Sequence, residues 1–286
     1  MKNSDFPMLF TAADEAAIAT QLNLKIFFIA SITGLLFGCL FSAFDHFSCR
    51  IISALLFIIS LFFVIGEKLF SFQKKWYLQR ALAESVKTAT WRFVMNADPY
   101  NKGDEKDEKK LTKVIQDLLL DNVEAAASTA SHLKDQGLIS ESMRKIRKFE
   151  LEEKTNYYFT NRVIDQKDWY KRKAVFNARK SKHLLISIVI CYIVAIALAI
   201  TRTTYNFSNL PIDLIAIFTG GIIGWMQINR FDELASAYTL TTHEIARIAE
   251  ERGRLTDNEK LGNFVADAEN AFSREHTQWA ARRDHG

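Results

Sequence analysis

The chain has few of the residues that build a disulfide scaffold or interrupt a helix. Its 286 residues include three cysteines and three prolines. An odd cysteine count with no Cys-x-x-Cys pair excludes a disulfide framework and a cysteine zinc site. Pro7 and Pro99 lie outside the long apolar runs, and Pro211 suits the first turn of a helix. The composition therefore allows long, continuous helices.

Signals for strands and for catalysis are also lacking. The sequence has no Asn-Gly or Asp-Gly turn between alternating segments, and no phosphate-binding glycine motif. His243-Glu244 is not followed by the second histidine of a zinc helix, because Arg247 stands at that position. We therefore expect an all-α protein that is not an enzyme, with no catalytic residue, cofactor or metal ion.

Neither sign of charge dominates the chain. It has 37 Lys and Arg residues against 33 Asp and Glu, a net charge of +4. No motif for RNA or DNA binding is present, so a nucleic-acid partner is not expected.

What the chain does have is four long apolar runs without charge, arranged as two pairs. A membrane-spanning helix needs about 20 mostly apolar residues. With short extensions of the second and fourth runs, all four approach this length, at residues 26–44, 51–70, 184–201 and 210–228. A buried soluble bundle is the alternative, but Ile and Phe on every face of the runs argue against it. The lipid bilayer is therefore the expected surroundings of four transmembrane helices in two hairpins.

Basic residues gather at one end of each run, which sets the expected topology. The two short loops on the other side contribute only Arg50 and Arg202. Both termini and the long middle region are therefore predicted to be cytoplasmic, where the helices extend into a helical bundle. One continuous helix is predicted from Ser140 through Lys182 into the third run. The basic residues are Lys25, Lys68, Lys74, Lys75, Arg80, Lys171, Arg172, Lys173, Arg179, Lys180, Lys182 and Arg230.

Small residues recur every fourth position in three of the runs and form ridges where another helix can approach closely. Packing within one subunit and packing between subunits explain these ridges equally well. No run carries a charge near its middle, which disfavours a coupled transporter and leaves open a nonselective pore lined by small and hydroxyl residues. The ridge residues are Ala30, Gly34, Gly38 and Ser42; Ser187, Cys191, Ala195 and Ala199; and Ala216, Gly220 and Gly224.

Two stretches carry a resemblance to a known family. One is the segment 76–93 after the first hairpin, and the other leads into the second hairpin. Together they resemble the SLATT domains, two-transmembrane effector domains associated with SMODS nucleotidyltransferases and SLOG proteins. The chain looks like two such units in tandem, at residues 8–145 and 146–284. The second stretch, together with similar residues beyond the second hairpin, provides the cytoplasmic motif. Its residues are Arg162, Asp165, Gln166, Trp169, Lys173, Asn177 and Trp279.

Most residues of this motif fall on one helical stripe, which has two interpretations. The stripe could pair with Glu233, Glu244 or Glu269 on later helices. Alternatively, it is a solvated face with snorkelling basic residues. In the first unit Glu84, Lys87 and Arg92 could play a comparable part.

The resemblance implies a function as well as a fold. It implies a bacterial inner-membrane effector of a conflict or anti-phage defence system, which oligomerises and forms a pore or disrupts the membrane. These 286 residues show no SMODS or SLOG domain beside the tandem units, so we expect a separate sensor or nucleotidyltransferase protein, or a nucleotide signal, to trigger it. The alternative is a membrane scaffold or sensor subunit that recruits a cytoplasmic partner without conducting ions.

Overall fold

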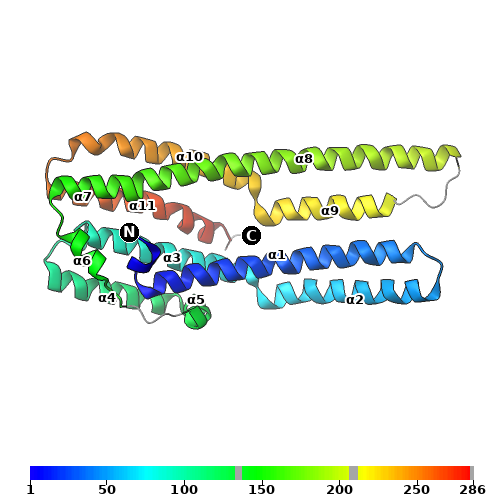
Figure 1. Cartoon of the computed structure of the whole chain (residues 1–286), viewed down its shortest axis with the longest axis horizontal. Helices are drawn as coiled ribbons and strands as arrows, with labels where there is room; N and C mark the ends of the chain where they lie inside the picture. The colour runs from blue at the N-terminus through cyan, green and yellow to red at the C-terminus, as the bar shows by residue number, and fades with distance from the viewer. Residues whose placement is uncertain (133–136, 206–211, 284–286) are drawn as a thin grey trace. The chain divides into compact units, whose positions relative to one another are not determined.

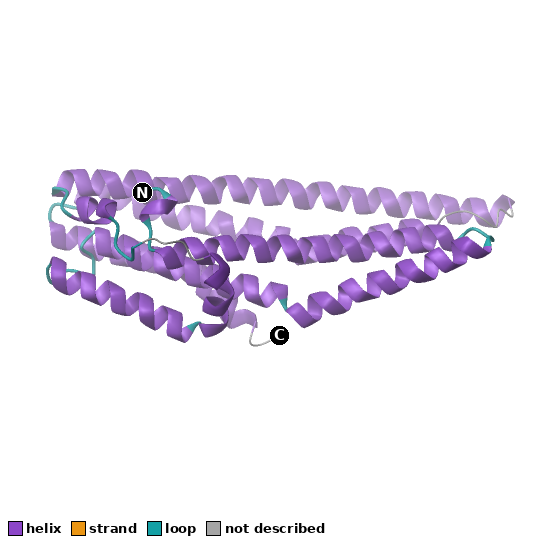
Figure 2. Cartoon of the chain, turned by 60° about the horizontal axis from the view of Figure 1, so that its bottom comes forward, coloured by secondary structure: helices purple, strands orange, loops and turns teal. Residues whose placement is uncertain are grey.

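Helices form nearly all of the chain in the computed structural model, which describes residues 1–132, 137–205 and 212–283 (Figure 1). The side chains of residues 203, 205 and 273–283 are outside this description. These ranges contain no strand, which confirms the all-α prediction (Figure 2). The α-helices are α1 (Met8–Ser42), α2 (Phe47–Phe70), α3 (Phe72–Val94), α4 (Asp104–Asp121), α5 (Val123–Thr129), α6 (Glu141–Arg147), α7 (Leu151–Tyr158), α8 (Asp165–Tyr205), α9 (Ile212–Asn229), α10 (Phe231–Ala249) and α11 (Asn258–Arg283).

The helices belong to two compact units. The bundle unit consists of residues 1–21, 73–171 and 240–286, and the span unit of residues 22–72 and 172–239. The boundaries fall inside α1, α3, α8 and α10, so the backbone passes between the units in helical conformation. All four predicted spans lie in the span unit.

Four helices are long and apolar enough to cross a membrane. At most 22% of the most apolar window of any of them is buried within the chain, and in α8 the share is 0%. A soluble bundle would bury such windows, so this exposure favours lipid as their surroundings. The predicted spans at 51–70 and 184–201 lie within α2 and α8, whereas the first ends with α1 at Ser42. In the fourth, residues 210 and 211 are outside the described residues.

Within the span unit, α1 and α2 approach closely because small residues face each other. Ser53 Oγ donates to Gly38 O at 2.7 Å, and Ser60 Oγ donates to Ser31 O at 2.8 Å. A Cβ atom added at Gly34 would lie 3.0 Å from Ser60 Cβ. Buried hydroxyls with a carbonyl partner and glycine at the contact allow two helices to pack without a hydrophobic driving force.

A second close contact joins α1 to α9. A Cβ at Gly221 would lie 2.9 Å from the Ile32 side chain, and one at Gly224 would lie 3.0 Å from the Phe28 ring. The Phe28 and Trp225 rings pack with their centroids 5.9 Å apart. The first span therefore contacts both the second and the fourth.

Each second span helix ends at the same kind of break. Ser71 follows α2 and Arg230 follows α9, and both residues adopt left-handed backbone conformation with φ of 49°. A phenylalanine then begins the next helix at once, Phe72 in α3 and Phe231 in α10. A left-handed residue is a common way to end a helix. By contrast, α1 and α8 pass through their spans unbroken.

Aromatic side chains fill the core of the bundle unit. Trp91 is 2% exposed and packs edge-on against Tyr158, with ring centroids 5.7 Å apart. Phe159 and Phe264 stack at 5.2 Å with an interplanar angle of 13°. These contacts hold α3 and α11 against the segment that leads into α8.

The prediction of one helix from Ser140 through Lys182 is wrong. α6 ends at Arg147, and α7 begins only at Leu151. The Arg147 carbonyl, left over at the end of α6, accepts a hydrogen bond from Lys154 Nζ at 2.8 Å, and Lys154 is 3% exposed. This buried contact stabilises a helix end that no local sequence signal marks.

Replacing Gly34 by Leu should destabilise the span unit, because the added side chain meets Ser60 and the backbone carbonyl of Leu56, 3.2 Å from the new Cβ. Backbone cannot move aside as a flexible side chain can, and overpacking costs about 1–3 kcal/mol. The thermal unfolding midpoint of the full chain in detergent measures the effect. Gly220→Leu is the control, since no atom lies within 4 Å of its Cβ position. Equal midpoints for the two variants would contradict the packing described.

Candidate functional site: a buried ion pair and a polar pocket

The carboxylate of Glu269 is the centre of a buried network in the bundle unit. It is 0% exposed and accepts hydrogen bonds from Arg162 Nε at 2.8 Å and Arg162 Nη2 at 2.6 Å. Tyr158 Oη donates to it at 2.9 Å and Thr88 Oγ1 at 3.2 Å. The network joins α3, α7, the segment before α8 and α11. Glu269 is one of the three acidic residues suggested as partners for the motif stripe.

Arg162 lies in a π-helical segment, Phe159–Ile164, between α7 and α8. π-helical turns are rare and frequently occur at functional sites. The guanidinium is 1% exposed, packs over the Phe272 ring at 5.1 Å, and leaves Nη1 buried without a hydrogen-bond partner. The wide turn thus delivers a charged group into the bundle core.

The ion pair keeps Arg162 charged although it is buried. Burial alone would lower the pKa of the guanidinium, but the adjacent Glu269 carboxylate raises it above its ordinary value. Burial, followed by the charge of Glu269, raises the pKa of Tyr158 well above 10.0. The Tyr158 hydroxyl therefore remains a hydrogen-bond donor at physiological pH.

Lys87, one helical turn from Glu84 on α3, lies near the same network. Desolvation by burial is the largest cause that lowers its pKa from 10.5; Glu84 opposes this shift, and the charge of Arg162 adds to it. Lys87 Nζ also lies 6.0 Å from the centre of the Phe10 ring. Folding thus places a cation where its charge is disfavoured.

A second buried arginine fixes the loop between α3 and α4. Arg147 Nη2 donates to Tyr100 O at 3.1 Å and pairs with the buried Asp107, while Nε pairs with Asp104 at 2.9 Å. Nη1 donates to Phe93 O. These contacts hold the loop in place from one side.

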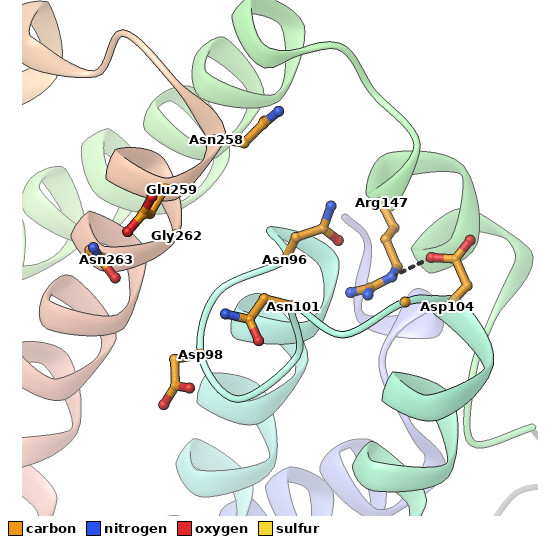
Figure 3. A pocket seen from close by; sticks show the side chains of 10 residues that line it. Asn96, Asp98, Asn101, Asp104, Arg147, Asn258, Glu259, Gly262 and Asn263 are labelled. Atoms are coloured by element: carbon orange, nitrogen blue, oxygen red, sulfur yellow. Dashed lines mark hydrogen bonds and ion pairs between the residues drawn. The ribbon is translucent and has the colours of Figure 1, made fainter.

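The same loop borders a pocket of about 470 Å³ that is also lined by the start of α11 (Figure 3). Asn96, at a positive φ of 54°, has a buried Oδ1 without a hydrogen-bond partner. Gly262 lets α11 come close, since its Cβ would lie 3.4 Å from Asn96 O. The pocket is lined by Asn96, Asp98, Asn101, Gly103, Asp104, Arg147, Asn258, Glu259, Gly262 and Asn263.

The lining determines which molecules the pocket suits. Side-chain amides both donate and accept hydrogen bonds, which suits a polar small molecule or a peptide. Three carboxylates face the pocket, and its single arginine is already paired with Asp104. A phosphate group would meet net negative charge there. Among the described residues, no group of three or more His, Cys, Asp or Glu could hold a metal ion.

The other motif residues have different surroundings. Asn177 is 5% exposed and donates to Lys173 O at 2.8 Å, whereas the Lys173 side chain is exposed and lies over the Phe176 ring. Gln166 and Trp169 are half-buried and Asp165 is exposed. The Trp279 side chain is outside the described residues. The stripe is therefore partly buried and partly solvated.

The small residues of the ridges also differ in their exposure. Gly34 and Gly38 are buried; Ala30, Ser187, Cys191, Ala195 and Gly224 are half-buried; and Ser42, Ala199, Ala216 and Gly220 are exposed. The α9 contact with α1 uses Gly221 and Gly224. Sequence reasoning missed the face of α2 that carries Ser53 and Ser60, whose spacing of seven residues was the available signal.

Two family models match the chain. Residues 7–155 match the model described as SMODS and SLOG-associating 2TM effector domain 3, and residues 158–279 match domain 1 of the same description. These matches confirm the resemblance to tandem SLATT domains; the unit boundary between residues 145 and 146 stays a prediction. No match is found among curated proteins or solved structures. Each matched half contributes to the Glu269 network, Thr88 from the first and Arg162 from the second.

Removing one partner of the buried pair should be strongly destabilising. Glu269→Leu leaves Arg162 charged and uncompensated, which typically costs about 3–5 kcal/mol. Combining it with Arg162→Met should recover much of the loss, because the remaining uncompensated charge is gone. Thermal unfolding of the full chain measures both. Arg144→Gln, which breaks an exposed pair with Glu108, is the control and should change little. No recovery in the double variant would contradict this account.

Lys87→Met should raise the unfolding midpoint at neutral pH, because a partly desolvated charge is removed. Since the pKa of Lys87 is lower in the folded chain, the unfolded chain binds more protons between that pKa and 10.5. Charged Lys87 therefore destabilises the folded chain at low pH. The free energy of unfolding rises as pH increases through this window, because Lys87 loses its proton. Below about pH 10, the unfolding midpoint of the variant should depend less on pH than that of the wild-type chain. Above about pH 10, ionisation of Tyr158 in the unfolded chain also changes the midpoint. Lys113→Met, at an exposed position, should keep the slope; an unchanged slope in Lys87→Met would refute the assignment.

Proposed function

Because the chain belongs to the SLATT family, with two of these two-transmembrane effector domains in tandem, we propose that it is a membrane effector of a bacterial conflict or anti-phage defence system. It is a multi-pass membrane protein with four candidate spans. In the proposal, subunits associate in the inner membrane and open a pore, or otherwise disrupt the bilayer, when a separate partner protein or nucleotide signals infection. No catalytic step is required.

The observation that carries this proposal is the largely unpacked surface of the spans. The α8 window has none of its residues buried within the chain. On α9, Ala216 and Gly220 are exposed, and no atom lies within 4 Å of the Gly220 Cβ position. Such a small-residue face allows a helix of a second subunit to approach closely. These features support a homo-oligomer.

The bundle unit is the proposed receiver of the trigger. Its Glu269 network ties α3 to the π-helical segment that leads directly into α8. The polar pocket offers hydrogen-bonding groups, but its carboxylates disfavour a phosphate. This chemistry supports a separate protein, rather than a nucleotide, as the molecule that binds at the pocket.

The proposed orientation places both termini in the cytoplasm. Basic residues concentrate at the ends of the spans that lead into the bundle unit, which is the pattern of cytoplasmic loops. A trigger made inside the infected cell would then meet the bundle unit directly.

One observation favours a second candidate, a membrane scaffold or sensor subunit without conductance. The polar pocket and the helices at residues 140–182 and 229–283 could recruit a cytoplasmic partner. This candidate predicts a stable complex and no ion flux.

Expression of the full chain with its genomic partner should collapse the membrane potential and arrest growth, whereas an empty vector should not. A potential-sensitive dye in cells and ion flux from liposomes containing the purified chain measure the effect. Gly220→Leu should weaken assembly and slow depolarisation without disturbing packing inside the subunit, because the added side chain separates the small-residue faces of two subunits.

Two results would count against the proposal. Unchanged potential and growth with the partner present would favour the scaffold. A Gly220→Leu variant that assembles and depolarises normally would show that this face of α9 is not the subunit interface.

A further inference from the structure

The part of α8 just before its apolar run carries a dense group of basic side chains. Arg179, Lys180, Lys182 and His183, here called the basic collar, are all exposed and immediately precede Leu184, where the predicted span begins. The sequence has no Asp or Glu between Asp168 and Asp213. The collar therefore lacks negative neighbours along its own helix.

The collar covers one side of the helix. At about 100° per residue, its four side chains fan over roughly 160° of the circumference. Ala174, Asn177 and Ser181 occupy the opposite side and are buried, at 7%, 5% and 6% exposure. The outward side is thus basic, and the inward side is packed.

No carboxylate of the described chain neutralises the collar. Its residues form no ion pair there, whereas other basic residues near the spans do: Lys74 with Glu124 at 2.6 Å, Arg80 with Asp14 at 2.7 Å, and Arg230 with Glu233. Some basic residues near the other span ends thus have counter-charges within the chain, whereas the collar has no ion-pair partner among the described residues and is open to an external anion.

The depth of the collar identifies that anion. With a rise of about 1.5 Å per residue, Arg179 lies about 7.5 Å before Leu184 and Lys182 about 3 Å before it. The headgroup layer of a bilayer is roughly 5–7 Å thick on each side. Phe176, 50% exposed, lies one turn further out, with Lys180 Nζ 5.8 Å from its ring centre. Lysines and arginines this close to the end of a span are typical of the cytoplasmic interface.

We propose that the basic collar binds the phosphate groups of anionic phospholipids, so that α8 docks in a leaflet enriched in such lipids. The same unbroken helix continues into the span, so the collar meets lipid phosphates whenever the span is inserted. A nucleic acid would have to displace lipid headgroups to reach it. Lysines and arginines near an anionic surface are each attracted strongly enough that three together give a clear lipid preference.

Native mass spectrometry of the full chain in nonionic detergent, titrated with phosphatidylglycerol or phosphatidylcholine of equal chain length, tests this proposal. The wild-type chain should retain phosphatidylglycerol with about tenfold preference or more. The triple variant Arg179→Gln, Lys180→Gln, Lys182→Gln should lose that preference. A matched variant that removes three exposed charges from α4, Lys106→Gln, Lys110→Gln, Lys113→Gln, should keep it. Circular dichroism and the unfolding midpoint verify that both variants fold.

Equal retention of the two lipids, or an undiminished preference in the collar variant, would overturn the proposal. So would collar-dependent binding of inorganic phosphate or an oligonucleotide without preference for phosphatidylglycerol. The measurement needs no pore, so its outcome is separate from that of the depolarisation experiment.

Discussion

The fold depends on how backbone and side-chain polar groups are satisfied where no water is present. Helices that face lipid must close their hydrogen bonds internally. The few buried hydroxyls in the spans follow the same rule. Ser53 and Ser60 donate to carbonyls of α1, and Thr219 donates to the carbonyl one turn back in its own helix at 2.7 Å. Close packing at glycine brings these hydroxyls within hydrogen-bond distance of the carbonyls. The same contact therefore packs the helices and satisfies their buried polar groups.

In the bundle unit, the two buried arginines are each paired with a carboxylate. Arg162 meets Glu269, and Arg147 meets Asp107 together with two backbone carbonyls. Such pairs add little net stability compared with apolar residues, but leaving one member alone is costly. An arrangement of α3, α7 and α11 that separated Arg162 from Glu269 would therefore be costly. In this unit the ion pairs and the apolar core, which contains both aliphatic and aromatic side chains, join the same helices.

The sequence predicts those features that depend on local composition. Apolar run length predicts the span helices. Of the two interpretations of the motif stripe, pairing with a later acidic residue holds for Arg162, which meets Glu269. Features set by distant partners are not predictable in this way. The end of α6 depends on Lys154 reaching Arg147 O, and the face of α9 that meets α1 is set by helix crossing, which selects Gly221 over Gly220. A four-residue repeat of small residues predicts which helix face can pack closely. It does not predict which other helix packs against that face.

The π-helical segment at Phe159–Ile164 has a geometric consequence for everything that follows it. A wide turn stores surplus backbone relative to regular α-helix. If one residue of that surplus were absorbed, the downstream helix would swivel by about 100° and slide by about 1.5 Å. Since α8 runs without interruption to Tyr205, this screw motion would reach the far end of the third span undiminished. Arg162, which Glu269 anchors, lies inside this wide turn, so the ion pair holds the segment in which such a motion would begin.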